Sequence, residues 1–123
     1  MGAEADVDLQ ALERLRKLGG KELVSKMVML FTSHAESAIR DAAGGIASGD
    51  LDTVRRAAHS LKSSAGNLGA LQVQAAADEI EQLTQERAAD AQSLLTNLEK
   101  TYLRAKERLT EEIREGKLED SDR

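Results

Sequence analysis

The stretch DLDTVRRAAHSLKSSAGNLG, residues 50–69, has the clearest structural pattern in this sequence. Its apolar side chains recur at steps of three and four residues, at Leu51, Val54, Ala58, Leu61, Ala65 and Leu68. That spacing places them on one face of an α-helix. Asp50 can accept hydrogen bonds from the free amides of the first turn, and Gly69 can adopt the left-handed angles that end a helix. The stretch therefore predicts one amphipathic helix with a defined start and end.

Helical spacing continues on both sides of this stretch. Glycine-containing breaks divide the rest of the chain into further predicted helices over about 6–18, 21–47, 70–87 and 90–115. The chain has no proline and few β-branched or aromatic residues, which favours helices over strands. We therefore expect an all-α fold, an antiparallel four-helix bundle with an additional short N-terminal helix packed at one end.

Length and composition limit the chemistry of this chain. With 123 residues it is expected to form a single domain, with ordered helices over about 6–115 and a flexible tail over 116–123. That length leaves no room for a protein kinase, and the sequence has no glycine-rich loop for ATP phosphates. It contains no cysteine, which excludes thiol nucleophiles, disulfides and cysteine metal sites.

Charge and hydropathy limit the partners. The 17 Lys and Arg residues against 22 Asp and Glu give a net charge of −5, and the chain has one Tyr and one Phe. Nucleic-acid modules need a basic stripe and usually stacking aromatics, so we expect no nucleic-acid partner. No apolar run approaches the roughly 20 residues that span a bilayer. The sequence predicts a soluble, cytoplasmic monomer without a membrane partner.

His59 is the candidate reactive residue, because it is predicted to point outward from the middle of the helix over 50–69. Its helical neighbours are Arg55 at i−4, Lys62 at i+3, Ser63 at i+4 and Gly66 at i+7. Cations beside an imidazole favour its neutral, nucleophilic form and would stabilise a phosphoryl group attached to it. Small neighbours leave room for another protein. From these residues alone, an exposed histidine with incidental neighbours remains the alternative.

Other chemistries find less support. His34 lies beside the apolar face of the predicted helix 21–47, and we assign it no role. Ser60 and Ser63 share a helix with His59 and cannot form a hydrolase triad with it. The sequence has no Glu-x-x-His pair of the kind that builds di-metal centres in bundles, so we expect no metal site.

A family resemblance lies in residues 55–70, which read RRAAHSLKSSAGNLGA. This run resembles the signature of histidine-containing phosphotransfer (HPt) domains, in which an Ala-His-x-Leu-Lys-Gly-Ser run surrounds the phosphorylated histidine and an apolar-Gly-Ala run follows. Upstream, ASGDLDTVRR at 47–56 is similar to the family's turn into that helix. The resemblance covers about 6–115 and is specific over about 47–71. One position departs: Ser63 replaces the usual Gly, and we expect its hydroxyl to be tolerated.

The resemblance implies a phosphorelay carrier of bacterial two-component signalling. A phosphoryl group would arrive from the aspartyl phosphate of one response-regulator receiver domain, or from a hybrid histidine kinase, and leave to the aspartate of another receiver. The receiver would supply Mg²⁺, so the chain itself would need no metal or cofactor. It would carry the phosphoryl group without kinase or ATPase activity of its own.

The resemblance also assigns roles to residues. His59 would be the nucleophile through Nε2, Lys62 would orient and neutralise the phosphoryl oxygens, and Ser63 and Arg55 would assist at the rim. Gly66 would provide clearance. Receivers dock on HPt domains through an apolar patch around the histidine, for which the candidates here are the exposed members of the set Leu12, Leu15, Met27 and Leu30.

Two other functions stay open. The chain could be the phosphorylated substrate domain of a histidine kinase of the chemotaxis type, although the run Leu68-Gly69-Ala70 is more similar to relay domains. It could also be a helical adaptor whose histidine is never phosphorylated. Replacing His59 by Gln separates the adaptor from the other two.

Overall fold

The computed structural model describes residues 7–121, and over that range the chain forms helices and short turns without a strand. Its elements are α2 (Leu9–Ser48), α3 (Leu51–Leu68), α4 (Leu71–Glu81), the short 3₁₀ helix η1 (Gln85–Asp90) and α5 (Ala91–Ser121). The prediction of an all-α fold is therefore confirmed. None of the helices described is both long and apolar enough to cross a membrane.

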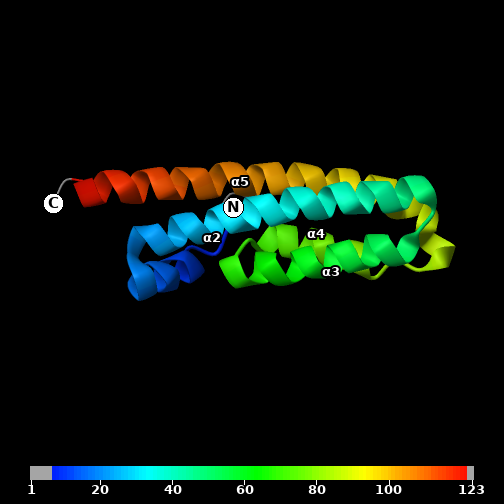
Figure 1. Ribbon diagram of the computed structural model, residues 1–123, viewed down its shortest axis with the longest axis horizontal. Coiled ribbons are helices and arrows are strands. Elements are labelled where there is room, and N and C mark those ends of the chain that lie inside the picture. Colours follow the sequence, from blue (N-terminus) through cyan, green and yellow to red (C-terminus); the bar gives the residue numbers. More distant parts are fainter. Residues whose placement is uncertain (1–6, 122–123) are drawn as a thin grey trace.

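The long helices lie along a common axis, and consecutive ones run in opposite directions (Figure 1). α3 packs against α2 and α4, while α5 packs against α4 and α2. The helices thus surround one core, filled by a single cluster of apolar side chains that includes Phe31, Leu61, Val73, Leu98 and Leu109. This arrangement leaves the outer side of α3 open to solvent.

A sharp kink at Gly19 and Gly20 divides α2 into two parts. Gly20 has φ 72° and ψ −170°, a conformation that L side chains rarely adopt. The predicted helices over 6–18 and 21–47 correspond to two parts of one element joined at the kink; this element begins at Leu9, and residue 6 lies outside the described range. The first part lies against the turn between α3 and α4, where the Asp8 amide donates a hydrogen bond of 2.7 Å to the Gly69 carbonyl.

The helix over 50–69 begins and ends where its sequence predicts. The Asp50 carboxylate accepts hydrogen bonds from the Thr53 amide at 3.2 Å and from the Thr53 hydroxyl at 2.6 Å. At the other end Gly69 has φ 87°, and its amide donates to carbonyl oxygens of the last turn. These local contacts determine the residues at which α3 begins and ends.

The fourth helix is shorter than its sequence pattern predicts, because α4 ends at Glu81 rather than near residue 87. Leu83 enters the core with only 1% of its surface exposed, and Thr84 is extended with φ −112° and ψ 167°. Arg55 of α3 binds the Leu83 carbonyl, which a continuing helix would have bonded to the amide of residue 87. Tertiary contacts thus end this helix early.

The last helix, α5, begins at Ala91 and continues to Ser121, beyond the predicted end near residue 115. A helical backbone does not test the flexible tail predicted over 116–123, and residues 122–123 lie outside the described range. The division into a single domain over 1–123 likewise stays a prediction.

Candidate functional site

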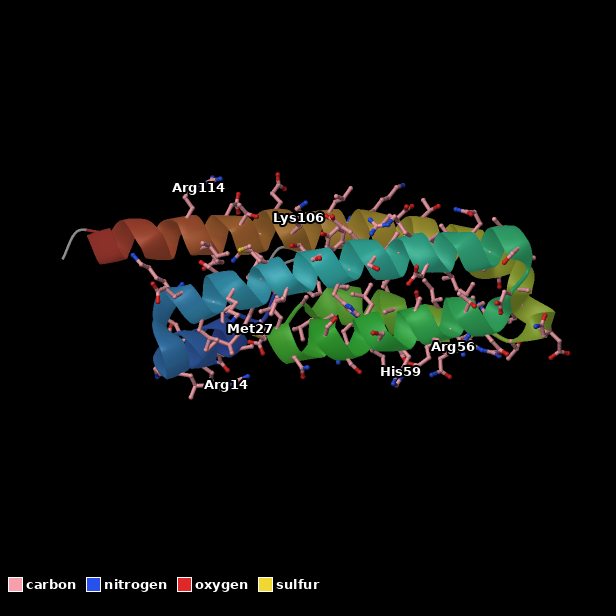
Figure 2. The ribbon with its side chains drawn as sticks, in the orientation of Figure 1. Arg14, Met27, Arg56, His59, Lys106 and Arg114 are labelled. Atoms are coloured by element: carbon pink, nitrogen blue, oxygen red, sulfur yellow. The ribbon has the colours of Figure 1, made fainter. Side chains whose placement is uncertain are left out.

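His59 projects from the outer side of α3, away from α2 and α5 (Figure 2). Its side chain is 63% exposed, whereas its neighbours Ala58 and Leu61 are buried in the core. The outward orientation expected from the apolar stripe is therefore present. An exposed imidazole in the middle of a rigid core helix can be approached by another protein without unfolding of this one.

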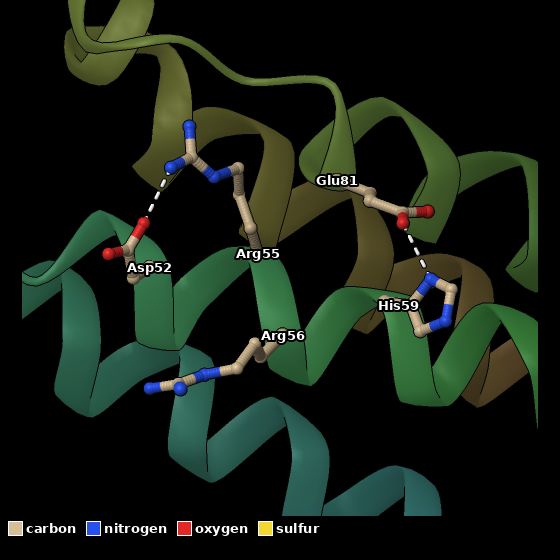
Figure 3. A pocket seen from close by; sticks show the side chains of 5 residues that line it. All are labelled: Asp52, Arg55, Arg56, His59 and Glu81. Carbon is tan, nitrogen blue, oxygen red and sulfur yellow. Dashed lines mark hydrogen bonds and ion pairs between the residues drawn. The ribbon is translucent and has the colours of Figure 1, made fainter.

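The His59 ring is held by a carboxylate on the neighbouring helix. Its Nδ1 lies 2.6 Å from Oε2 of Glu81, the last residue of α4 (Figure 3). A carboxylate only accepts, so the ring donates its proton from Nδ1, and in the neutral imidazole the lone pair is then on Nε2. Within the described part of the chain no residue hydrogen-bonds to Nε2. The ring is thus oriented with its nucleophilic nitrogen free.

Lys62, one turn further along α3, is bound to the same carboxylate. Its Nζ lies 2.8 Å from Glu81 Oε1 and 3.1 Å from Asp78 Oδ1. The Glu81 and Asp78 carboxylates raise the pKa of Lys62. The hydrogen bond from Lys62, followed by the one from His59, lowers the pKa of Glu81. The hydrogen bond from Lys62, followed by the one from Gln82, lowers the pKa of Asp78. All three groups are therefore charged at neutral pH.

The arginine predicted at the rim makes structural contacts instead. Arg55 donates to the Leu83 carbonyl at 2.9 Å and to Asp52 Oδ1 at 2.6 Å, so it ties the end of α4 to α3. Arg56 lines the same pocket as His59 and is exposed, with its side chain extending away from the imidazole (Figure 3). The cations expected next to the ring are thus directed mainly towards carboxylates and a carbonyl.

Ser63 and Gly66 complete the predicted flank of His59. Ser63 is exposed, as its position at i+4 predicts. A Cβ at Gly66 would lie 2.7 Å from Nε2 of Gln74, so this glycine allows a side chain of α4 to approach α3. The space that the glycine was predicted to leave for a partner is therefore occupied by the Gln74 side chain of the same chain.

His34 lies near the site but contacts a different residue. Its Nε2 is 2.8 Å from the hydroxyl of Ser60, which follows His59 on α3. This contact links α2 to α3 at the residue next to His59. It gives His34 a structural partner, and we assign it no chemical role.

The four apolar residues considered for docking differ in exposure. Leu12 is only 4% exposed and packs in the core, because the first part of α2 turns its apolar side to the bundle, so it is not one of the exposed members from which the docking patch was predicted. Leu15 and Met27 are partly buried against the core. Leu30 is 56% exposed and remains available to a partner.

Sequence reasoning missed the two acidic residues of the site. Neither Asp78 nor Glu81 is among the site residues predicted from the sequence. They lie three residues apart on the side of α4 that faces α3. The only sequence signal was their spacing, which equals that of His59 and Lys62 on α3.

Comparison with known proteins identifies the family. The sequence pattern of the family described as Hpt domain matches residues 26–119, well over half of the chain. This chain belongs to the Hpt domain family. Hpt domains serve histidine phosphotransfer in phosphorelays, passing phosphoryl groups between kinases and response regulators. The resemblance stated from residues 55–70 is therefore confirmed.

A solved structure shares the fold. The crystal structure of histidine-containing phosphotransfer protein B (HptB) from Pseudomonas aeruginosa PAO1 superimposes with a TM-score of 0.80. The match has 21% sequence identity and covers 89% of this chain and 96% of that chain. Among curated proteins, none matches this sequence. The structural match shows that this Hpt domain has the helical architecture of that protein.

Proposed function

We propose that this Hpt domain carries a phosphoryl group on His59 between the aspartates of response-regulator receiver domains. One observation carries the proposal: His59 is 63% exposed, and the Glu81 carboxylate binds its Nδ1 and leaves Nε2 free. A relay histidine needs both properties, because a receiver must reach the ring and the attacking nitrogen must hold a lone pair.

The transfer step follows from this tautomer. Nε2 of neutral His59 attacks the phosphorus of the receiver's aspartyl phosphate in line, and an N–P bond forms as the P–O bond to the aspartate breaks. The aspartate leaves as a carboxylate with the electron pair. The Nδ1 proton stays on the ring, which becomes positively charged beside Glu81. Transfer to the next receiver reverses these steps.

The neighbours have supporting roles in this proposal. Lys62 orients and neutralises the phosphoryl oxygens once it turns from α4 towards Nε2, and the Ser63 hydroxyl donates to them at the rim. Arg55 joins the rim only by leaving Asp52 and the Leu83 carbonyl. The receiver provides Mg²⁺ and its own acidic pocket, so this chain needs no cofactor.

The proposal also covers setting and assembly. Receivers dock on the side of α2 and α3 around His59, with Leu30 and the partly buried Leu15 and Met27 as apolar contacts. The domain acts as a cytoplasmic monomer and has neither kinase nor ATPase activity of its own. Its fold is an antiparallel four-helix bundle with residues 9–18 packed at one end, which the helix directions in Figure 1 and the contact of Asp8 with Gly69 support.

The test is phosphoryl transfer from a panel of receiver domains that have been phosphorylated with a small phosphodonor and Mg²⁺. Intact mass at neutral pH is read for the wild type, His59→Gln and the matched control His34→Gln, which removes the other histidine of the chain. We expect one added phosphoryl group on the wild type and on His34→Gln, and none on His59→Gln. The added group should be lost in acid and stable in base.

Each other outcome points to a different function. Phosphorylation by a histidine kinase and ATP but by no receiver would identify a kinase substrate domain. Absence of phosphorylation from both sources, with circular dichroism showing an intact fold, would overturn the proposal in favour of an adaptor. Phosphorylation that persists in His59→Gln would move the site to another residue.

A further inference from the structure

Lys62 is held between two carboxylates of α4. Its Nζ pairs with Glu81 at 2.8 Å and with Asp78 at 3.1 Å, and its side chain is 31% exposed. Gln82 donates to the same Asp78 oxygen at 3.3 Å, which keeps that carboxylate facing Lys62. The ammonium group is therefore fixed on the α4 side of the site, where Glu81 also binds His59 Nδ1.

This position sets up a competition once His59 is phosphorylated. The phosphoryl group would be attached at Nε2, on the opposite side of the ring from Nδ1, and it would carry nearly two negative charges. Lys62 can neutralise it only by giving up part of its contact with the carboxylates. Stronger binding of Lys62 by α4 therefore means weaker stabilisation of the phosphohistidine.

The two carboxylates can be separated by what they touch. Glu81 binds both His59 and Lys62, so changing it alters the ring as well as the cation. Asp78 contacts Lys62 and Gln82 but not the imidazole. Asp78 is thus the residue through which the position of Lys62 can be changed while the Nδ1 contact is kept.

We propose that Asp78 is a positioning residue that holds Lys62 against α4 and so sets how a phosphoryl group is shared between His59 and an aspartate of a receiver. This inference rests on the proposed function of His59. Asp78 destabilises the phosphohistidine, and thereby favours onward transfer. The chain is then a carrier that gives up its phosphoryl group readily.

The first experiment measures the equilibrium constant for phosphoryl sharing between this chain and one receiver domain. Asp78→Asn is compared with the wild type and with Glu79→Gln, which removes the same charge from an exposed neighbour on α4 that makes no ion pair within the described residues. Exposed ion pairs shift equilibria by up to about fivefold, so we expect a roughly twofold to fivefold shift towards phosphohistidine in Asp78→Asn. Glu79→Gln should stay near the wild-type value.

A second background tests whether Asp78 acts through Lys62. In a Lys62→Gln chain, adding Asp78→Asn should leave the sharing equilibrium unchanged, because no cation remains to be released. An equal shift in Asp78→Asn and Glu79→Gln, no shift in either, or a shift that persists without Lys62 would each overturn the inference. A merely structural role of Asp78 would not depend on Lys62 in this way.

A receiver-independent measurement separates this inference from the proposed function. Phosphoramidate can phosphorylate an accessible imidazole directly, and ³¹P NMR then follows the titration of the attached phosphoryl group. A cation drawn to the phosphoryl oxygens favours the dianion, so the titration midpoint should lie lower in Asp78→Asn than in the wild type and Glu79→Gln. Equal midpoints would overturn the role of Asp78 even if receivers transfer. A lower midpoint without transfer from any receiver would support the control of Lys62 by Asp78 and overturn the proposed function instead.

Discussion

Two networks that each contain a ring, a glutamate and a lysine lie on opposite seams of the bundle. Between α3 and α4, the ring of His59 and the ammonium of Lys62 bind Glu81. Between α2 and α5, the Tyr102 hydroxyl donates to Glu36 at 2.7 Å and Lys106 pairs with the same oxygen at 3.1 Å. Each seam thus joins a ring, a glutamate and a lysine.

Exposure separates the two networks. Tyr102 is 3% exposed, and burial, together with its hydrogen bond to Glu36, raises the pKa of its hydroxyl, so that group stays protonated and joins two helices. The His59 side chain is 63% exposed, and no described residue hydrogen-bonds to its second nitrogen. The same kind of contact therefore encloses the ring in the core on one seam and leaves the ring accessible to another molecule on the other.

Removing the Tyr102 hydroxyl should give the largest effect on stability. Tyr102→Phe deletes a part-buried hydrogen bond from a buried ring to a charged group, and we expect the free energy of unfolding to fall by about 1–2 kcal/mol. Phosphorylation of His59 should be unchanged. Urea denaturation measures the first quantity and intact mass the second. Unchanged stability would show that the α2–α5 network does not hold the bundle.

Replacing each glutamate by glutamine should show which of the two networks affects phosphoryl transfer. Glu81→Gln replaces a charged acceptor by a neutral one at Nδ1, and we expect the transfer rate to fall about fivefold, the difference between charged and neutral hydrogen bonds. Glu36→Gln is the matched control, because it makes the same change on the other seam. Rapid-quench kinetics with one phosphorylated receiver compares them. A similar loss of rate in both variants would contradict the division.

Acid should weaken both networks in the same direction. Contacts with Tyr102 and Lys106 lower the pKa of Glu36, and contacts led by Lys62 lower the pKa values of Asp78 and Glu81. A lowered carboxyl pKa contributes stability that is fully present above the ordinary values of 3.8 and 4.5 and is lost as the pH falls through the lower folded values.

Urea midpoints measured from pH 7 down to pH 3 test this prediction. The urea midpoint of the wild type should stay about constant from pH 7 down to the ordinary pKa values of the carboxyl groups and fall below them. Glu36→Gln should lose less over that range, since it lacks one of the three groups. An equally steep loss in Glu36→Gln would show that the α2–α5 carboxylate contributes nothing.

The smallest expected effect concerns the departure from the family motif. Ser63→Gly restores the usual residue at an exposed position within α3, where Gly is a poorer helix former than Ser by about 0.5 kcal/mol. We expect a stability loss of about that size, and a transfer rate within a factor of about two, because the serine hydroxyl makes one exposed hydrogen bond at most. A large gain in rate would show that Ser63 obstructs the ring.

Local sequence features predicted the helix that carries the site. The apolar spacing from Leu51 to Leu68 and the capping residues Asp50 and Gly69 gave bounds that the structure reproduces. The outward position of His59 followed from the same spacing. Such features were predictable because caps and periodicity depend only on residues within one helix.

Contacts between helices were not predictable in the same way. The end of α4 depends on the burial of Leu83 and on Arg55 of another helix, so periodicity alone extended it too far. Leu12 belongs to the set from which the family resemblance draws a docking patch, but the kink at Gly20 turns its segment onto the core, and sequence alone does not show which members of that set stay exposed.

The sequence by itself determined an all-α Hpt domain with an exposed histidine at position 59, because helix periodicity, capping and the residues around the histidine are local properties. Only the tertiary structure decided the partners of that histidine. Glu81 lies 22 residues from His59, and Asp78 lies 16 residues from Lys62. Their meeting depends on how α4 is rotated against α3, which the packing of apolar side chains between the helices sets.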